Sequence, residues 1–139
     1  MTTENHKSTA KADTVLVVED EVLLRLVIAD YLRDCGFRVI EAADADEAIV
    51  VLKQPQLAVD VVFSDIEMPG SMDGFGLAQW TRSNRPGVEV ILTGSVPRAV
   101  NAAATLCESE GPVPKPYEPQ TVHHRIRRLL AARSNNKKR

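Results

Sequence analysis

Five polar side chains in this sequence follow the ends of apolar runs. They are Glu19, Asp20, Asp65, Thr93 and Lys115. Short runs rich in β-branched residues are typical of buried strands. If these strands are parallel, their carboxyl ends meet at one edge of a sheet, where open α/β folds bind ligands. The spacing therefore predicts a polar site at that edge.

Phosphoryl transfer is the chemistry that these side chains suit. Carboxylates brought together repel one another unless a cation joins them. Oxygen ligands favour a hard cation, and Mg²⁺ typically uses one or two carboxylates, water and phosphate oxygens. The hydroxyl of Thr93 and the ammonium of Lys115 suit the other oxygens of a phosphoryl group. The set predicts a site in which the Asp65 carboxylate is the nucleophile.

The elements that would carry these residues alternate five times between strand and helix patterns. We expect strands at residues 14–18, 37–42, 59–65, 88–93 and 112–115, and helices at 22–35, 45–54, 75–84, 97–107 and 119–132. This alternation predicts an α/β fold, with a parallel sheet, helices on both faces and right-handed crossovers.

Two prolines predict where the fifth strand lies in the sheet. Pro112 and Pro114 are two residues apart, so their missing N–H groups face the same side. Val113 and Lys115 would donate to the other side. A strand with one side unable to donate belongs at the border of a sheet.

Composition and length indicate one ordinary globular domain. The chain has 139 residues, of which 44% are hydrophobic and 26% charged. No apolar run approaches the roughly 20 residues of a membrane span, and the polar N-terminus shows no secretory signal. Cys35 and Cys107 form no metal-binding pattern, so we expect reduced thiols in a cytoplasmic protein.

Charge is uneven along the chain. Its net charge is −2, but seven of its 17 basic residues lie in residues 125–139, which contain no acid. A basic tail can contact nucleic acid or an acidic partner, but no helix-turn-helix pattern is present. We expect a disordered segment at 1–13, the domain at 14–132, and a solvated, frayed basic tail at 133–139.

Four motifs in order resemble the response regulator receiver domain (CheY-like) of bacterial two-component systems. They are VVEDE at 17–21, DIEMP at 65–69 followed by Asp73-Gly74, LTG at 92–94, and PKPY at 114–117. Each motif alone is weak, but four at successive strand ends are specific. The resemblance covers about residues 14–132. It implies a doubly wound, flavodoxin-like parallel sheet of five strands, in the order 2-1-3-4-5, flanked by five helices.

The resemblance also implies roles for the acids. Asp65 matches the phosphoacceptor, which takes a phosphoryl group from a phosphohistidine of a sensor histidine kinase or a histidine phosphotransferase. Glu19 and Asp20 match the acid pair that binds Mg²⁺ together with the acceptor. Glu67 matches the position whose backbone carbonyl ligates the ion.

Residues on the fourth and fifth strands match the groups that contact the phosphoryl group. Thr93 matches the switch hydroxyl, Gly94 is the small residue beside it, and Lys115 matches the bridging lysine. The family resemblance further implies a cis peptide bond between Lys115 and Pro116.

Three departures from the family pattern change these expectations. Glu19 stands where Asp is usual, and Gly70-Ser71 lengthens the loop by one residue. Pro112 occupies the usual position of a switch aromatic, so Tyr117 is the possible substitute. The small Gly94 would leave the acceptor open to water, which favours a short-lived phosphoryl state.

We therefore expect a stand-alone receiver, because only seven residues follow residue 132. It would signal to an unknown downstream protein through the face formed by the fourth helix, fifth strand and fifth helix. On this face we expect Arg98, Arg125 and Arg128. We expect a monomer or weak dimer with no membrane contact and no enzymatic activity beyond its own phosphorylation and dephosphorylation.

Three other functions fit parts of the sequence. A pseudo-receiver would bind partners without phosphorylation. An aspartyl-phosphate hydrolase of the haloacid-dehalogenase type would use Asp65 and Glu67, but that resemblance requires an N-terminal strand and a longer chain. A nucleotide-binding doubly wound domain needs a glycine-rich first turn, where this chain has Glu19-Asp20-Glu21.

Overall fold

The computed structural model describes residues 12–95 and 111–138. Within these residues the elements are β1 (Thr14–Val18), α2 (Val22–Asp34), β2 (Arg38–Ala42), α3 (Ala45–Leu52), η1 (Pro55–Leu57), β3 (Val61–Asp65), α4 (Gly74–Asn84), β4 (Glu89–Gly94), β5 (Val113–Pro114) and α6 (Pro119–Lys138). The helix expected at 97–107, with Arg98 and Cys107, lies outside the described residues, as does most of the segment 1–13.

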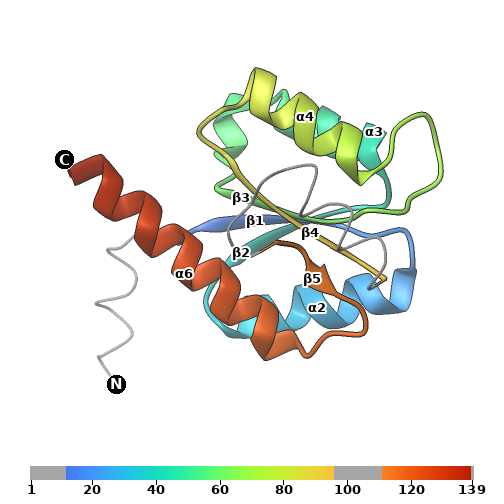
Figure 1. The fold of residues 1–139 in the computed structure, drawn as a ribbon, viewed down its shortest axis with the longest axis horizontal. Helices are drawn as coiled ribbons and strands as arrows, with labels where there is room; N and C mark the ends of the chain where they lie inside the picture. The colour runs from blue at the N-terminus through green and yellow to red at the C-terminus, as the bar shows by residue number, and fades with distance from the viewer. Residues whose placement is uncertain (1–11, 96–110, 139) are drawn as a thin grey trace.

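The strands form one parallel sheet in the order β2-β1-β3-β4-β5, as expected (Figure 1). Its register decides which residues meet at the carboxyl edge. Val18 pairs with Ser64, and Asp65 pairs with Thr93. Thr93 pairs in turn with Val113, which stands two residues before Lys115. The polar residues predicted to meet therefore lie on neighbouring strands at the same level.

Helices cover both faces of the sheet (Figure 1). Alternate residues of the central strands face opposite sides, because successive side chains in a strand point in opposite directions. Val15 and Val17 pack with residues of α2 and α6. Leu16 and Val18 pack with residues of α3 and α4. Among the described helices, none is long and apolar enough to span a membrane.

Helix α2 is buried only toward its C-terminal half. Ile28, Ala29 and Leu32 are buried in the core. Four apolar residues near its N-terminus are instead exposed: Val22, Leu23, Leu26 and Val27. The apolar spacing predicted the helix correctly, but it could not indicate that the first turns project beyond the cover of the sheet.

The last helix is longer than its sequence pattern predicts. We expected it to end at residue 132 and a frayed tail to follow, whereas α6 continues to Lys138. Arg133 explains part of the difference, since its guanidinium bonds to the Asp60 carboxylate at 3.0 Å and the Gly87 carbonyl at 3.1 Å. These contacts hold the helix against the amino-terminal edge of the sheet.

Other element boundaries differ by a few residues. The second strand begins at Arg38 rather than Phe37, and α3 ends at Leu52 before a short 3₁₀ turn at Pro55–Leu57. The fifth strand is reduced to Val113–Pro114 and pairs with β4 at the border of the sheet. Its border position is the one that the two prolines predicted.

Candidate functional site

Three carboxylates converge at the carboxyl edge of the sheet. Glu19, Asp20 and Asp65 each have an oxygen atom within 4.8 Å of one another. Glu19 and Asp65 are buried, and Asp20 is exposed. All three are oxygen donors, so the set suits a hard divalent cation such as Mg²⁺. The structure thus brings together the acids that the sequence predicted as neighbours.

Two hydrogen bonds hold the turn after β1 in place. The Glu19 N–H donates to the Ala42 carbonyl at the end of β2, at 3.0 Å. The Glu19 carboxylate accepts from the Glu21 N–H at 3.1 Å. Glu21 precedes the first residue of α2, so the first acid is fixed beside the helix N-terminus, where negative charge is favourable.

Lys115 joins two of the acids. Its Nζ atom donates to Glu19 Oε1 at 3.0 Å and to Asp65 Oδ2 at 3.1 Å. The extra methylene of Glu19, relative to aspartate, lengthens the reach of its carboxylate. In this structure it brings the carboxylate to the lysine. The Lys115–Pro116 bond is cis, as expected.

Burial dominates the electrostatics of the site. It raises the pKa of Glu19, although hydrogen bonds from Glu21 and Lys115 oppose that shift. Burial also raises the pKa of Asp65, against the opposing effect of Lys115. For Lys115 burial lowers the pKa, but its hydrogen bonds to Glu19 and Asp65 outweigh burial and raise the pKa overall. The carboxylates thus hold their charges at a cost that a bound cation would reduce.

Thr93 is buried next to Asp65, but its hydroxyl is turned toward the border strand. Its Oγ1 atom donates to the Val113 carbonyl at 2.7 Å. Gly94 follows at the end of β4, and its carbonyl accepts from the Lys115 N–H at 2.6 Å. The hydroxyl therefore has a resting partner on β5 that it would have to leave in order to contact a group on Asp65.

A cavity of about 480 Å³ opens over Asp65. It is lined by Glu21, Leu24, Asp65, Glu67, Ser95, Lys115, Pro116 and Tyr117. Tyr117 forms part of the wall and packs edge-on against Phe63, with ring centroids 5.5 Å apart. Burial, followed by the charges of Glu19 and Asp65, raises the pKa of its hydroxyl. The Tyr117 hydroxyl therefore lies close enough to Asp65 to be affected by the charge of its carboxylate.

The loop after Asp65 is closely packed at Gly74. The Gly74 N–H donates to the Ile66 carbonyl at 2.8 Å. A Cβ atom at this position would lie 2.3 Å from the Asp65 carbonyl oxygen, which is backbone and cannot move aside cheaply. Asp73 caps α4 through the Gly76 N–H at 3.0 Å. The Asp73-Gly74 pair therefore returns the chain to the main chain of Asp65 and Ile66.

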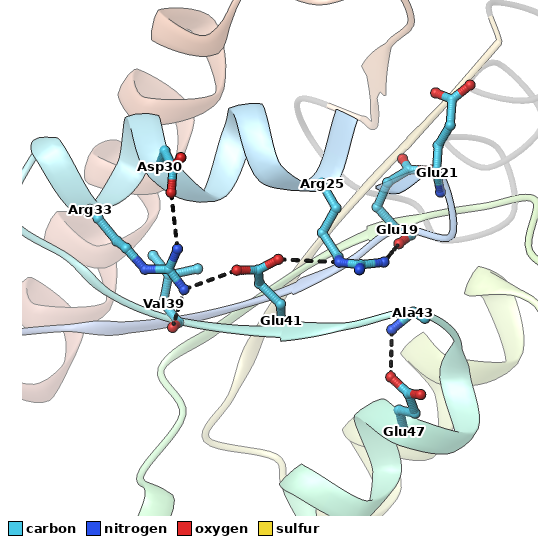
Figure 2. A network of polar contacts seen from close by, with 9 residues as sticks. All are labelled: Glu19, Glu21, Arg25, Asp30, Arg33, Val39, Glu41, Ala43 and Glu47. Atoms are coloured by element: carbon cyan, nitrogen blue, oxygen red, sulfur yellow. Dashed lines mark hydrogen bonds and ion pairs between the residues drawn. The ribbon is translucent and has the colours of Figure 1, made fainter. Parts of the chain in front are cut away.

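Arg25 is a residue near the site that the sequence did not single out. Its Nη1 atom donates to the Glu19 carbonyl at 2.9 Å, and its Nε atom donates to Glu41 at 3.2 Å (Figure 2). Arg25 lies in an amphipathic helix and Glu41 in an alternating strand, so both read as ordinary surface residues. Only the packing of α2 against β2 brings them together.

The strand order and the acidic carboxyl edge define a doubly wound α/β protein of the flavodoxin-like class. The chain matches the family model of the response regulator receiver domain over residues 15–127, and it belongs to that family.

Relatives of known sequence differ in length. The chain is similar to the probable transcriptional regulator ycf27 of Cyanophora paradoxa, with 32% identity, covering 87% of this chain and 49% of the relative. It spans about half the length of such relatives. It is also similar to the probable chemotaxis protein CheY of Rhizobium etli, with 31% identity, covering 90% of this chain and 98% of that protein.

Solved structures show the same fold. The receiver domain of the hybrid histidine kinase CckA has a TM-score of 0.68 and 30% identity, covering 84% of this chain and 98% of that one. A response regulator receiver protein from Sinorhizobium medicae WSM419 has a TM-score of 0.77 and 28% identity, covering 88% and 98%.

Proposed function

We propose that this receiver domain accepts a phosphoryl group on Asp65 from a phosphohistidine of a sensor histidine kinase or histidine phosphotransferase. An oxygen of the Asp65 carboxylate attacks phosphorus, the phosphorus–nitrogen bond breaks, and its electron pair returns to the imidazole. An acyl phosphate forms. The observation that carries the proposal is the position of Asp65 at the open cavity, with two further carboxylates and one ammonium group beside it.

The acids suit a Mg²⁺ site. Glu19, Asp20 and Asp65 supply carboxylate oxygens within 4.8 Å of one another, and the Glu67 carbonyl is the additional ligand that the family resemblance suggests. When bound, Mg²⁺ would supply positive charge to the carboxylates and the phosphoryl oxygens at once. The protein holds two of these carboxylates in place before that charge arrives, because Lys115 already bonds to both Glu19 and Asp65.

Lys115 and Thr93 would respond to the new charge. Lys115 already touches Asp65, so a small movement would bring its ammonium to a phosphoryl oxygen. Thr93 would exchange the Val113 carbonyl for another such oxygen, beside the small Gly94. Because Val113 belongs to the border strand, this exchange would pass the change to β5, with Tyr117 as the nearby aromatic in place of Pro112.

We further propose that the chain acts by switching a protein contact rather than as a turnover enzyme. The CheY relative, of which the chain covers 98%, supports a stand-alone receiver, whereas the longer ycf27 relatives carry additional sequence. The border strand β5 and helix α6 are the described parts of the face that the downstream protein would read.

Phosphorylation itself can be tested with acetyl phosphate. Incubation with acetyl phosphate and Mg²⁺ should give a retarded band on a Phos-tag gel, and Asp65→Ala should abolish it. Asp34→Ala, which removes an exposed acid at the end of α2, serves as the control and should keep the band.

Two other results would point elsewhere. No retarded band in the parent protein, with intact partner binding, would favour a pseudo-receiver. Sustained turnover of p-nitrophenyl phosphate that depends on Asp65 would favour the aspartyl-phosphate hydrolase instead.

A further inference from the structure

A chain of charged side chains connects helix α2 to strand β2 and reaches the main chain of Glu19 (Figure 2). Glu41 lies at its centre. One carboxylate oxygen accepts from Arg25 Nε at 3.2 Å, and the other accepts from Arg33 Nη2 at 3.1 Å. Arg33 also donates to the Val39 carbonyl and to Asp30. Glu41 is thus held between two arginines from the same helix.

The two arginines differ in what else they reach. Arg25 extends to the turn after β1 and donates through Nη1 to the Glu19 carbonyl at 2.9 Å. Arg33 donates to the Val39 carbonyl, part-way along β2. The Arg25 side chain is 17% exposed and that of Arg33 is 41% exposed. The bond nearest the acids is therefore also the better shielded from water.

The Glu19 carbonyl is a sensitive point for the site. It belongs to the peptide plane between Glu19 and Asp20, so holding this carbonyl limits the positions that the main chain and side chain of Asp20 can take. The Glu19 N–H is already fixed by the Ala42 carbonyl on β2. With Arg25 holding the carbonyl, both peptide groups of Glu19 are fixed, one by a neighbouring strand and one by the following helix.

We propose that Arg25 is a positioning residue for the metal-binding acids and that Glu41 orients it. The inference rests on the proposed Mg²⁺ site and deepens it. This positioning role requires two N–H donors in a fixed planar arrangement, one directed to Glu41 and one to the Glu19 carbonyl. The guanidinium group of Arg25 provides both. A lysine at the same position would offer a single ammonium group that cannot reproduce this fork.

This role differs from that of a surface ion pair. An exposed pair contributes little to stability and nothing specific to a ligand site. A partner that orients a metal ligand instead changes metal affinity, typically by ten- to a hundredfold when it is removed. Because Arg33 shares Glu41 with Arg25 but bonds to β2 rather than to the acid turn, the chain contains its own matched control.

The test is titration of the metal-free protein with MgCl₂ alone in a calorimeter. Arg25→Met should weaken Mg²⁺ binding about tenfold. Arg33→Met should change the dissociation constant less than about threefold. Arg25→Lys should resemble Arg25→Met. Thermal unfolding in EDTA is measured in parallel, and both methionine variants should lose similar stability there.

Glu41→Gln is the milder variant if Arg25→Met does not fold. It keeps an oxygen for Arg25 but removes the charge, so Mg²⁺ binding should weaken about threefold. Arg25→Met, or Glu41→Gln in its place, with parental Mg²⁺ affinity would overturn the positioning role while leaving the proposed function intact. Equal weakening by Arg25→Met and Arg33→Met would also overturn it, since general loosening of α2 would then be the cause. A parent protein that binds no Mg²⁺ would overturn both the inference and the metal part of the proposed function.

Discussion

Asp65 and Glu19 are two buried carboxylates that share one ammonium group. Lys115 lies 3.1 Å from the first and 3.0 Å from the second. Burial raises the pKa of both acids despite this partner. Ionising these two acids is therefore less favourable in the folded protein than in water, so the charged form of Asp65 reduces the folding stability.

Replacing the Asp65 carboxylate with a neutral group should therefore stabilise the metal-free protein. Asp65→Asn keeps the side-chain shape, removes one charge and leaves Lys115 to Glu19. We expect the melting temperature in EDTA at neutral pH to rise by roughly 3–5 °C, measured by circular dichroism. A fall in melting temperature would mean that the Asp65–Lys115 pair stabilises the fold after all.

The same prediction has a definite pH dependence. A carboxyl group whose pKa is raised on folding contributes most stability when it is protonated, and that contribution is lost as pH rises through the folded-state pKa. The advantage of Asp65→Asn should therefore be absent below the ordinary aspartate pKa of 3.8 and should grow as pH rises above it. Melting temperatures of both proteins across this range, in EDTA, test the sign.

At the scale of elements, two glycines at the ends of connecting segments differ in their surroundings. A Cβ atom at Gly74, the first residue of α4, would meet the backbone of Asp65 and Ile66 at 2.3 and 2.7 Å. A Cβ atom at Gly87, in the turn before β4, would have no described neighbour within 4 Å. Helix α4 thus begins in direct contact with the main chain at the end of β3.

Gly74→Ala should consequently destabilise the protein by about 3 kcal/mol, because a backbone contact cannot relax as a side chain can. Gly87→Ala should be neutral or up to about 1 kcal/mol more stable, since alanine restricts the unfolded chain. Urea denaturation followed by Trp80 fluorescence compares the two. Equal stability of the two variants would contradict the close approach.

A second contact between elements ties α6 to the end of the sheet opposite the site. Asp60 accepts from the Thr14 N–H at 2.8 Å and from Arg133 at 3.0 Å. Arg133 also donates to the Gly87 carbonyl. One carboxylate therefore joins the starts of β1 and β3 to the C-terminal part of the last helix.

Arg133→Met should reduce the free energy of unfolding by about 1–2 kcal/mol, because it leaves a partly buried carboxylate with one fewer charged partner. Arg38→Met, at an exposed arginine of β2, should change it by less than about 0.5 kcal/mol. Chemical denaturation of both variants measures the difference. An Arg133 variant as stable as the Arg38 variant would show that the contact is energetically silent.

At the scale of the whole molecule, the two ends of the sheet have different tasks. The carboxyl edge carries the acids, the lysine and the cavity, whereas the amino edge carries the Asp60–Arg133 contact. Thr93 connects the first edge to the border strand through its bond to Val113. The proposed function therefore predicts that a change at Asp65 reaches β5 while the opposite end of the fold stays fixed.

Amide NMR can follow this path. Beryllofluoride with Mg²⁺ should shift the amide signals near Asp65 and also those of Val113 and Lys115, because Thr93 leaves the Val113 carbonyl. Mg²⁺ alone should shift signals near Glu19 and Asp65 more than those of β5. In Thr93→Ala the beryllofluoride-dependent shift at Val113 should shrink. Large shifts at Asp60 in the parent protein would contradict a fixed amino edge.

The sequence was sufficient to predict the parallel α/β fold and the residues at its carboxyl edge. Apolar runs mark buried strands, and the residue that follows a strand must lie at its end, so Asp65 and Thr93 could be placed without coordinates. The border position of β5 followed from Pro112 and Pro114 for the same local reason, since a missing N–H group limits pairing wherever the strand lies.

What required the tertiary structure were contacts between residues distant in the chain. No local pattern indicated that Arg25 bonds to Glu41 or that Lys115 bonds to Glu19. Nor did any pattern indicate that α6 continues through the contact of Arg133 with Asp60. Each depends on how far a flexible side chain reaches across a particular packing of helix on sheet. Local patterns determine which element a residue occupies, whereas the register and docking of the elements decide which charge it meets.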